Sequence, residues 1–375
     1  MANKSDLPTL KWGIVGCGTI SSRFVSDLCL GRPDATTKHV IEAVGSSSMD
    51  KASAFVAEHC PAQKPALYDS YEALYNHVSV DIVYIGTPHV LHCENALGAI
   101  AAGKHVLCEK PFALNALETR RMIDAARAKG VFLMEGSQVS PLSTSTILKC
   151  LIAVWTRFFP VAKKFQSLLH DEKAIGDIAS VFVDFGLYMP ISIADPTRRT
   201  ASRALGAGAL LDLGIYTLTW ASLALDTALS SRHPNVVASM AFASETNPDK
   251  KVDEFTSVVL QYPDLKAHAI CTSSLLYKSA EEFAHVYGSK GSISVGGHMA
   301  SRPQYLVVRL NGEEERRLDF NVPGFGFYYE ADAVGADIRA GRLENRTCSL
   351  DSTLAIMSRM DNARVQCGLT YPQEE

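Results

Sequence analysis

A charged tripeptide, Glu109-Lys110-Pro111, is the first feature whose residue types could carry chemistry. It follows the apolar run His105–Cys108, which predicts a short buried strand, and the proline forces the chain to turn after the lysine. In an open α/β sheet, ligands bind beyond the carboxyl ends of the strands, so an amine at this place can act on a substrate. The alternative interpretation is a surface ion pair with a purely structural role.

A glycine turn near the N-terminus predicts a dinucleotide site. The apolar run Leu10–Val15 leads into residues 16–21, Gly-Cys-Gly-Thr-Ile-Ser, and a helical pattern follows. Gly16 permits the tight turn, and Gly18 lets a pyrophosphate approach the backbone at the helix N-terminus. Ser21 stands in place of a third glycine and is small enough for close helix–strand packing.

Three serines after the second predicted strand bear on which cofactor binds. The strand His39–Val44 is followed by Gly45 and serines 46–48, where an NAD-selective site usually carries an acidic residue for the ribose. Hydroxyls donate to a phosphate without repelling it, and Lys51, one turn into the next helix, can neutralise its charge. This chemistry favours NADP over NAD. The alternative is that the serines only cap the helix, and both roles can hold for different serines.

The elements around these residues alternate between strand and helix. The pair Asn115 and Glu118 forms a capping-box-like helix start, and Gly103 and Gly130 end two helices. Strands alternating with helices predict an α/β domain with a doubly wound parallel (Rossmann) sheet over residues 1–136. Its further predicted elements are a strand at 80–85, a helix at 91–102, a strand at 105–108, a helix at 115–130 and a strand at 131–134.

His89 and His92 have a spacing that suits a metal pair. Glu94 is the nearest carboxylate to them in the sequence, whereas catalytic zinc sites need three protein ligands and a water. We therefore expect no metal site. A loop histidine at the carboxyl edge of a sheet can still contact cofactor or substrate.

From Gly176 onward the pattern changes to successive strands with turns between them, which predicts a mainly antiparallel sheet. One helical stretch at about 206–225 and a last helix at about 352–366 accompany these strands. Residues 154–375 are therefore predicted to form an α+β domain with an open sheet. The predicted strands are 178–187, 236–243, 254–262, 267–275, 282–287 and 305–310.

Length and composition indicate a globular chain of about two domains. The 375 residues carry a net charge of −4, which disfavours nucleic acid and acidic membrane surfaces as partners. Nine cysteines at scattered spacings fit reduced thiols in the cytoplasm. Residues 1–8 lack the apolar segment of a secretory signal, and Asp212 interrupts the most apolar stretch, which makes it a poor membrane span.

Taken together, these motifs resemble the family of glucose–fructose oxidoreductase, inositol dehydrogenase and rhizopine-catabolism oxidoreductases over nearly the whole chain. The resemblance rests on the glycine turn, Thr87-Pro88, Glu109-Lys110-Pro111 and the run Asp212–Tyr216, Asp-Leu-Gly-Ile-Tyr. Within the family the chain is most similar to the branch of dimeric dihydrodiol dehydrogenase and fungal NADP-dependent D-xylose 1-dehydrogenases. Further marks of that branch are Val154–Pro160 and Tyr329–Asp332.

The resemblance implies an NADP-linked oxidoreductase that acts on a small sugar or diol and forms a homodimer through its C-terminal sheet. Tyr216 is the implied acid/base, Lys110 its electrostatic partner, and Asp212 holds a substrate hydroxyl. Trp155 and Arg157 are further substrate candidates. The implied cofactor-binding residues are Gly16, Gly18, Thr19, Ile20, Ser46, Ser48, Lys51, Thr87, Pro88, His89, Glu109 and Lys110.

Three functions remain open at this point. The first is oxidation of an aldose at C1 to the lactone, with D-xylose as the leading substrate and D-xylonolactone as its product. The second is oxidation of a trans-1,2-dihydrodiol. The third is a non-catalytic, NADP-sensing regulator of the same fold, against which the presence of both Lys110 and Tyr216 argues.

An atypical insert, 137–153, separates the two predicted domains. In the relatives that the motifs resemble, the Leu-Met-Glu strand end runs almost directly into Val-Trp-Thr-Arg. The insert has a Ser/Thr-rich front and a single charge, Lys149. We hypothesise that it is either a lineage-specific loop or the translation of an unspliced intron, which sequencing of the transcript distinguishes.

Overall fold

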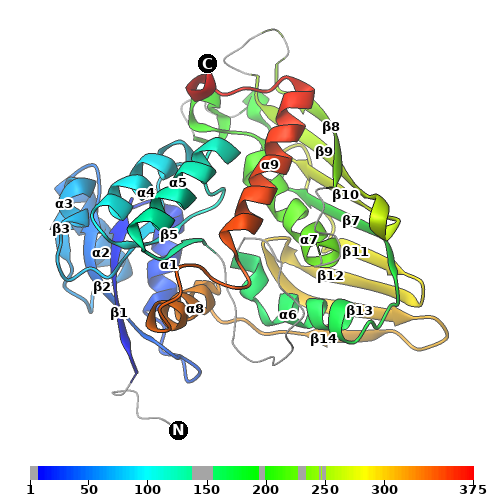
Figure 1. Cartoon of the computed structure of the whole chain (residues 1–375), viewed down its shortest axis with the longest axis horizontal. Coiled ribbons are helices and arrows are strands. Elements are labelled where there is room, and N and C mark those ends of the chain that lie inside the picture. Colours follow the sequence, from blue (N-terminus) through cyan, green and yellow to red (C-terminus); the bar gives the residue numbers. More distant parts are fainter. Residues whose placement is uncertain (1–6, 137–154, 194–198, 227–233, 245, 247–250) are drawn as a thin grey trace. The chain divides into compact units, whose positions relative to one another are not determined.

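The computed structural model describes residues 7–136, 155–193, 199–226, 234–244, 246 and 251–375, and the predicted insert 137–153 lies outside them. The chain forms two compact units (Figure 1), each built from two separate segments. The first unit is Met1–Pro141 with Pro323–Leu350, and the second is Leu142–Val322 with Asp351–Glu375.

The segment 323–350 is the main difference from the domain boundaries that the sequence suggested. The sequence pattern predicts this segment in the second domain, whereas its contacts place it in the first unit. Its helix α8 (Phe327–Arg339) packs against α1 (Thr19–Leu28), and the rings of Phe24 and Phe327 meet edge to face at 6.0 Å. This aromatic contact buries the apolar face of α8 on the first unit.

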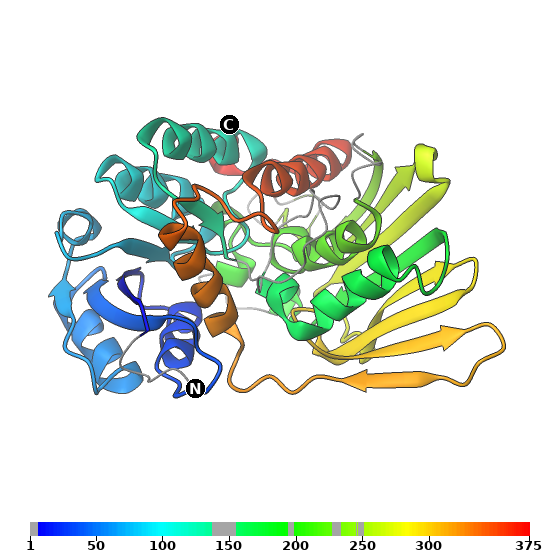
Figure 2. The same cartoon turned by 60° about the horizontal axis from the view of Figure 1, so that its bottom comes forward.

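A sheet of six parallel strands, in the order β3-β2-β1-β4-β5-β6, forms the centre of the first unit. This confirms the predicted doubly wound sheet. The strand order reverses between β1 and β4, where dinucleotides bind in such folds, and helices lie along both faces (Figure 2). The remaining elements are β1 (Thr9–Val15), β2 (Lys38–Gly45), α2 (Met49–His59), β3 (Ala66–Tyr68), α3 (Tyr71–Tyr75), β4 (Ile82–Ile85), α4 (His92–Ala101), β5 (His105–Cys108), α5 (Ala116–Lys129) and β6 (Leu133–Glu135).

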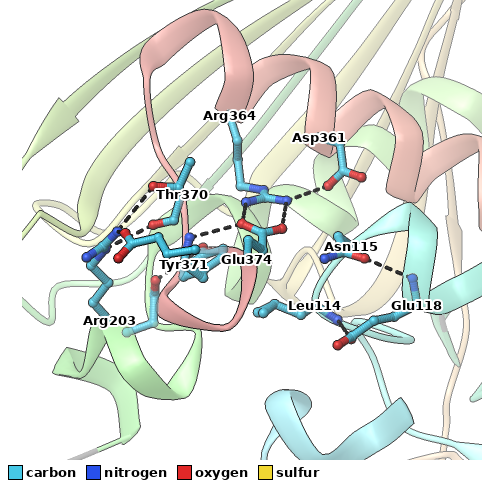
Figure 3. A network of polar contacts seen from close by, with 11 residues as sticks. Leu114, Asn115, Glu118, Arg203, Asp361, Arg364, Thr370, Tyr371 and Glu374 are labelled. Atoms are coloured by element: carbon cyan, nitrogen blue, oxygen red, sulfur yellow. Dashed lines mark hydrogen bonds and ion pairs between the residues drawn. The ribbon is translucent and has the colours of Figure 1, made fainter.

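The start and end of α5 lie where the capping residues predicted them. The side chain of Asn115 accepts a hydrogen bond from the backbone N–H of Glu118 at 2.9 Å, and the Glu118 carboxylate accepts one from Leu114 N–H at 3.0 Å (Figure 3). Gly130 ends the helix in the left-handed conformation, with φ +68°. Local hydrogen bonds thus define both ends of the element that follows Lys110.

The second unit contains a sheet of eight strands in the order β14-β13-β12-β11-β7-β10-β9-β8. Every pairing is antiparallel except that of β7 with β10, which confirms a mainly antiparallel sheet. The sequence pattern does not predict β12, which is rich in glycine and serine, or the short charged β14. Elements of this unit are α6 (Pro160–Gln166), β7 (Ile178–Gly186), α7 (Ile215–Leu225), β8 (Asn235–Phe242), β9 (Asp253–Tyr262), β10 (Ala267–Ser274), β11 (Glu282–Gly288), β12 (Gly291–Met299), β13 (Arg302–Leu310), β14 (Arg316–Asp319) and α9 (Leu350–Cys367).

Helices α6 and α7 cover one face of this sheet, and in the described part of the unit no helix covers the other (Figures 1 and 2). The helical run Arg203–Leu225 is long and apolar enough to cross a membrane by length and composition, but its apolar window is fully buried. Trp220 illustrates this burial, because its ring packs against Phe165 at 5.3 Å and its N–H donates to the Ala300 carbonyl. The run is therefore the core helix of the second unit.

Candidate active site

The glycine turn between β1 and α1 has the backbone that an anion site needs. Gly16 has φ +91°, and a Cβ there would lie 3.1 Å from the Thr87 side chain and 3.2 Å from the Gly86 carbonyl oxygen. Only glycine tolerates both the positive φ and this close approach of neighbouring atoms. Gly18 is the N-cap of α1, whose first turn carries neither a side-chain cap nor an acidic residue. The first N–H groups of α1 are therefore suited to a pyrophosphate.

Ser21 fulfils the packing role expected of it. Its side chain is fully buried, and a Cβ on Gly86, directly after β4, would lie 2.2 Å from its Oγ. Helix α1 can approach β4 this closely because Gly86 has no side chain. Gly86 thus provides the space for the Ser21 side chain, which a third glycine in the turn would not have needed.

The three serines after β2 have three different environments. Ser48 is the N-cap of α2 and accepts a hydrogen bond from the backbone N–H of Lys51 at 3.3 Å. Ser46 is buried and interacts with the Cys17 side chain. Ser47 is exposed, and Lys51 Nζ donates to its Oγ at 3.1 Å. The predicted cofactor residues omitted Ser47, although its spacing of four residues from Lys51 was visible in the sequence.

The loops after β4 and β5 are joined by a buried histidine. His92 is 1% exposed; its Nε2 lies 2.8 Å from the Thr87 carbonyl oxygen and its Nδ1 2.9 Å from the Pro111 carbonyl oxygen. Asn95, also on α4, donates to Thr87 Oγ1 at 3.1 Å. His89 is likewise buried. His92 therefore positions two site loops, a role that its spacing from His89 in the sequence does not indicate.

Glu109 and Lys110 follow β5. Glu109 is 7% exposed, and its carboxylate accepts hydrogen bonds from the Tyr84 hydroxyl at 2.7 Å and from the Lys110 backbone N–H at 3.2 Å. Burial raises the pKa of Glu109, while the Tyr84 hydrogen bond and the Lys110 charge oppose that rise. Glu109 thus anchors the turn that presents the half-buried Lys110. It does so through a hydrogen bond from the Lys110 backbone N–H and through attraction to the Lys110 charge.

In the second unit, one helical stretch brings Asp212 and Tyr216 together. A π-helical turn, Leu210–Gly214, leads directly into α7, and a spacing of four residues places the two side chains on the same helix face. Arg199 donates to Asp212 Oδ1 at 3.1 Å. The Tyr216 ring packs edge to face on Phe185 of β7 at 5.5 Å. Single π-helical turns are frequent at functional sites.

A buried carboxylate fixes the start of this helical stretch. Asp253 Oδ2 accepts hydrogen bonds from Leu210 N–H and Thr256 Oγ1, both at 2.7 Å. Gly208 has φ +140°, and a Cβ there would lie 1.9 Å from Asp253 Oδ1. Burial raises the pKa of Asp253 to about 6, against the effect of these hydrogen bonds. No sequence motif pointed to Asp253, because Leu210 lies 43 residues away in the chain.

Trp155 and Arg157 are the further substrate candidates, and Tyr188 and Arg203 are two more polar side chains of the second unit. Arg157 is fully buried, and the side chain of Trp155 lies outside the described part of the chain. Tyr188 is 67% exposed. Arg203 binds the C-terminal segment, donating to the Thr370 carbonyl at 2.9 Å (Figure 3). Arg203 is therefore engaged by the chain terminus.

The structure thus groups the predicted residues by unit. The turns after β1, β2, β4 and β5 all lie at the carboxyl edge of the parallel sheet. Together with the first turns of α1 and α2, they carry the predicted cofactor residues and Lys110. Asp212 and Tyr216 lie together in the second unit. Among the described residues, no cluster of three or more histidine, cysteine or acidic side chains suits a metal ion.

Comparison with family models identifies both units. Residues 10–137 match the model of an oxidoreductase family with an NAD-binding Rossmann fold, GFO_IDH_MocA. Residues 167–294 match the C-terminal domain model of the same family, GFO/IDH/MocA. The two matches cover the glycine turn, Lys110, Asp212 and Tyr216.

Curated relatives match along nearly the whole chain. D-xylose 1-dehydrogenase (NADP(+)) of Hypocrea jecorina is 33% identical over 394 residues, which cover 97% of this chain and 94% of that protein. Trans-1,2-dihydrobenzene-1,2-diol dehydrogenase of Xenopus laevis is 34% identical over 372 residues, covering 96% and 99%. A crystal structure of aldose–aldose oxidoreductase from Caulobacter crescentus, complexed with glycerol, has the same fold, with a TM-score of 0.77 at 24% identity over 96% of this chain and 98% of that one.

Proposed function

Since the chain belongs to the GFO/IDH/MocA family of oxidoreductases, we propose that it oxidises a CH–OH carbon of a sugar or diol with NADP. The observation that carries the proposal is the combination of two sites in one chain. The first unit has an anion-binding glycine turn with Lys110 at the same sheet edge, and the second has Asp212 and Tyr216 on one helix face. A protein that only sensed the cofactor would not require the second pair.

The choice of NADP rests on the turn after β2. Lys51 and Ser47 lie 3.1 Å apart in exposed positions, and a cationic amine with a hydroxyl suits the 2′-phosphate. The residues directly after β2 are serines, without the carboxylate that would repel this phosphate. Ser48 is engaged as a helix cap, so Ser47 replaces it as the proposed phosphate ligand. The name of the Hypocrea jecorina relative supports the same cofactor.

The proposed chemistry assigns a role to each of three side chains. Oxidation needs a base within hydrogen-bond reach of the reacting hydroxyl, and tyrosine, with a pKa of about 10, is a poor base unless a cation favours its phenolate. We assign Tyr216 as the base and Lys110 as that cation. Asp212, oriented by Arg199, binds a second hydroxyl. NADP, when bound, accepts the hydride that leaves the same carbon.

D-xylose, oxidised at C1 to D-xylonolactone, is the leading substrate, and a trans-1,2-dihydrodiol is the second candidate. The relatives at 33% and 34% identity carry these two activities in their names. Both substrates offer the same recognition chemistry, because each has a reacting hydroxyl next to a second hydroxyl that a carboxylate such as Asp212 can accept from.

The uncovered face of the second unit's sheet is the proposed homodimer surface. In the described part of this unit, that face carries large apolar side chains in exposed positions, among them Phe182 at 40%, Tyr287 at 47% and Val237 at 52% exposure. The rings of Phe182 and Tyr287 meet edge to face at 6.0 Å. A second copy of the sheet would remove this apolar surface from water.

A spectrophotometric assay tests the proposed function. NADP reduction is followed with D-xylose, D-glucose and a trans-dihydrodiol in parallel, and each substrate is also tested with NAD. We expect turnover with at least one substrate and a preference for NADP. Tight NADP binding without turnover of any substrate would overturn the enzyme and favour the regulator. Sedimentation of the same preparation reports whether a dimer forms.

A further inference from the structure

Glu330 is a buried carboxyl group that the proposed chemistry does not use. It lies in the first turn of α8, within the run Tyr329–Asp332. Asp332 of that run has an evident structural role, because it binds Arg32 and His39. Glu330 is fully buried, and neither of its carboxyl oxygens has a hydrogen-bond partner among the described residues. A buried, ionised carboxylate without partners is strongly unfavourable.

Glu330 faces the anchor of Lys110. A methyl group on Gly136 would lie 3.4 Å from Glu330 Oε2 and 3.8 Å from Glu109 Oε1, so the two carboxyl groups border the same point. Both oxygens of Glu109 already accept hydrogen bonds, from Tyr84 and from the Lys110 backbone N–H. Glu109 therefore has the hydrogen-bond donors that a buried anion needs, whereas Glu330 has no such donor among the described residues.

The described groups that act on the charge of Glu330 are acidic or neutral. Glu109 follows β5, Tyr84 lies on β4, and Asp27 lies on α1, where it accepts the backbone N–H groups of Phe325 and Phe327. Burial raises the pKa of Glu330 well above its usual range, and the charges of Glu109 and Asp27 add to that rise. Its place in the first turn of α8 favours the anion, but only by about 0.3–1 kcal/mol. The repulsion between the buried carboxyl groups of Glu109 and Glu330 exceeds this helix contribution, as in sites where one carboxyl group of a pair keeps its proton.

We propose that Glu330 carries a proton in the folded protein at neutral pH and acts as a positioning residue that limits the negative charge behind Lys110 to the single carboxylate of Glu109. When alkaline pH removes that proton to solvent, a second anion arises behind Lys110. The cation then supports a phenolate base less well, and turnover falls. The part of this inference that concerns turnover rests on the proposed function of Lys110, whereas the proton on Glu330 does not.

Glu330→Gln is the variant that tests the proposal, since glutamine keeps the shape of the side chain and cannot ionise. Glu58→Gln is the matched control, because Glu58 is a helix residue of the same unit whose side chain is 77% exposed. In infrared spectra at neutral pH, the wild type and the control should show the carbonyl stretch of a protonated carboxyl group, and Glu330→Gln should lose it. A wild type without this band would overturn the proposal.

Thermal unfolding gives a second, activity-independent measurement. A carboxyl group whose pKa rises on folding stabilises the protein fully below its unfolded pKa, and that stabilisation is lost as pH rises through its folded pKa. Glu330→Gln should therefore unfold close to the wild type at about pH 4 and at least about 3 °C higher than the wild type at about pH 9. Equal shifts in the variant and the control at both pH values would contradict a buried proton.

The pH profile of kcat/KM tests the link to Lys110. Removing the second anion should move the alkaline limb upward by about one pH unit in Glu330→Gln, and the control should keep the wild-type limb. An unchanged limb in Glu330→Gln would overturn the positioning role. If no sugar or diol is turned over, the proposed function fails, while the infrared and unfolding measurements still decide whether Glu330 holds the proton.

Discussion

In the first unit, the candidate site residues follow four parallel strands, whereas in the second unit the candidates Asp212 and Tyr216 share a single helix face. The first arrangement presents backbone N–H groups and loops, and buried side chains such as His92 hold these loops from behind. The second presents side chains at fixed helical spacing, and Asp253 holds the start of the helix. Backbone-rich edges suit a large phosphate-bearing cofactor, and a helix face suits a small polyol.

Removing one reactive group from each unit should have the largest effect. Tyr216→Phe and Lys110→Met should each lower kcat by on the order of 10²–10⁴-fold, because the base or its cation is lost. The NADP affinity of Tyr216→Phe, measured by fluorescence titration, should change little. Lys129→Met, at an exposed position, serves as the control for Lys110→Met. A fully active Tyr216→Phe variant would confine the chemistry to the first unit.

Removing the support behind the loops should act through stability. His92→Phe removes the imidazole whose two ring nitrogens lie within hydrogen-bond distance of the Thr87 and Pro111 carbonyl oxygens, and a buried carbonyl left without its donor costs about 1–3 kcal/mol. We expect the free energy of unfolding to fall accordingly, and NADP to bind more weakly. Urea denaturation measures the first and titration the second. His59→Phe, at a half-buried position of α2, keeps an aromatic ring against Phe55 and should alter neither by more than a small fraction of this.

A change at the turn after β2 should affect one cofactor selectively. Lys51→Ala removes a charge-assisted hydrogen bond to the 2′-phosphate, worth roughly 1.5–3 kcal/mol, so NADP affinity should fall by on the order of tenfold or more while NAD affinity stays nearly constant. Ser47→Ala should have the same selectivity and a smaller effect. Lys64→Ala, at an exposed position outside the turn, is the control. Equal losses for both cofactors would remove Lys51 from phosphate recognition.

The support of the helix face in the second unit should show in the pH dependence of stability. The pKa of Asp253 is raised to about 6, so its ionisation destabilises the folded protein as pH rises through 6. Asp253→Asn keeps an oxygen acceptor for Leu210 N–H and should be more stable than the wild type at about pH 8 by roughly 1–3 kcal/mol, with the difference shrinking below about pH 5. Denaturation at both pH values measures this. If the stability difference between Asp253→Asn and the wild type were the same at both pH values, packing and not charge would be its cause.

Local signals in the sequence predicted much of the fold. Alternating strand and helix patterns predicted the parallel sheet, and Asn115 with Gly130 predicted a helix and both of its ends. β12 was missed because its glycines and serines lack the apolar alternation of a half-buried strand. The packing of 323–350 on the first unit could not be predicted, because it depends on tertiary contacts such as Phe24 with Phe327.

The same division applies to the candidate site. The glycine turn and the Lys110 turn are recognisable because their residues are adjacent in the chain. His92, Asp253 and Glu330 were missed because each acts on groups that only the fold brings near, such as Leu210 for Asp253. A buried polar side chain reveals its role through its partner, and single-sequence patterns do not contain that partner.

Because the segment 323–350 completes the first unit, the order of synthesis affects when this unit can fold. The chain passes from one unit to the other after Pro141, after Val322 and again after Leu350. Domains generally fold as units during synthesis, beginning at the N-terminus. The cofactor unit, although it starts first, cannot be completed until α8 has left the ribosome with Glu330. We therefore expect nascent chains that end before α8 to remain sensitive to protease in the first unit, even when its six strands have all been made.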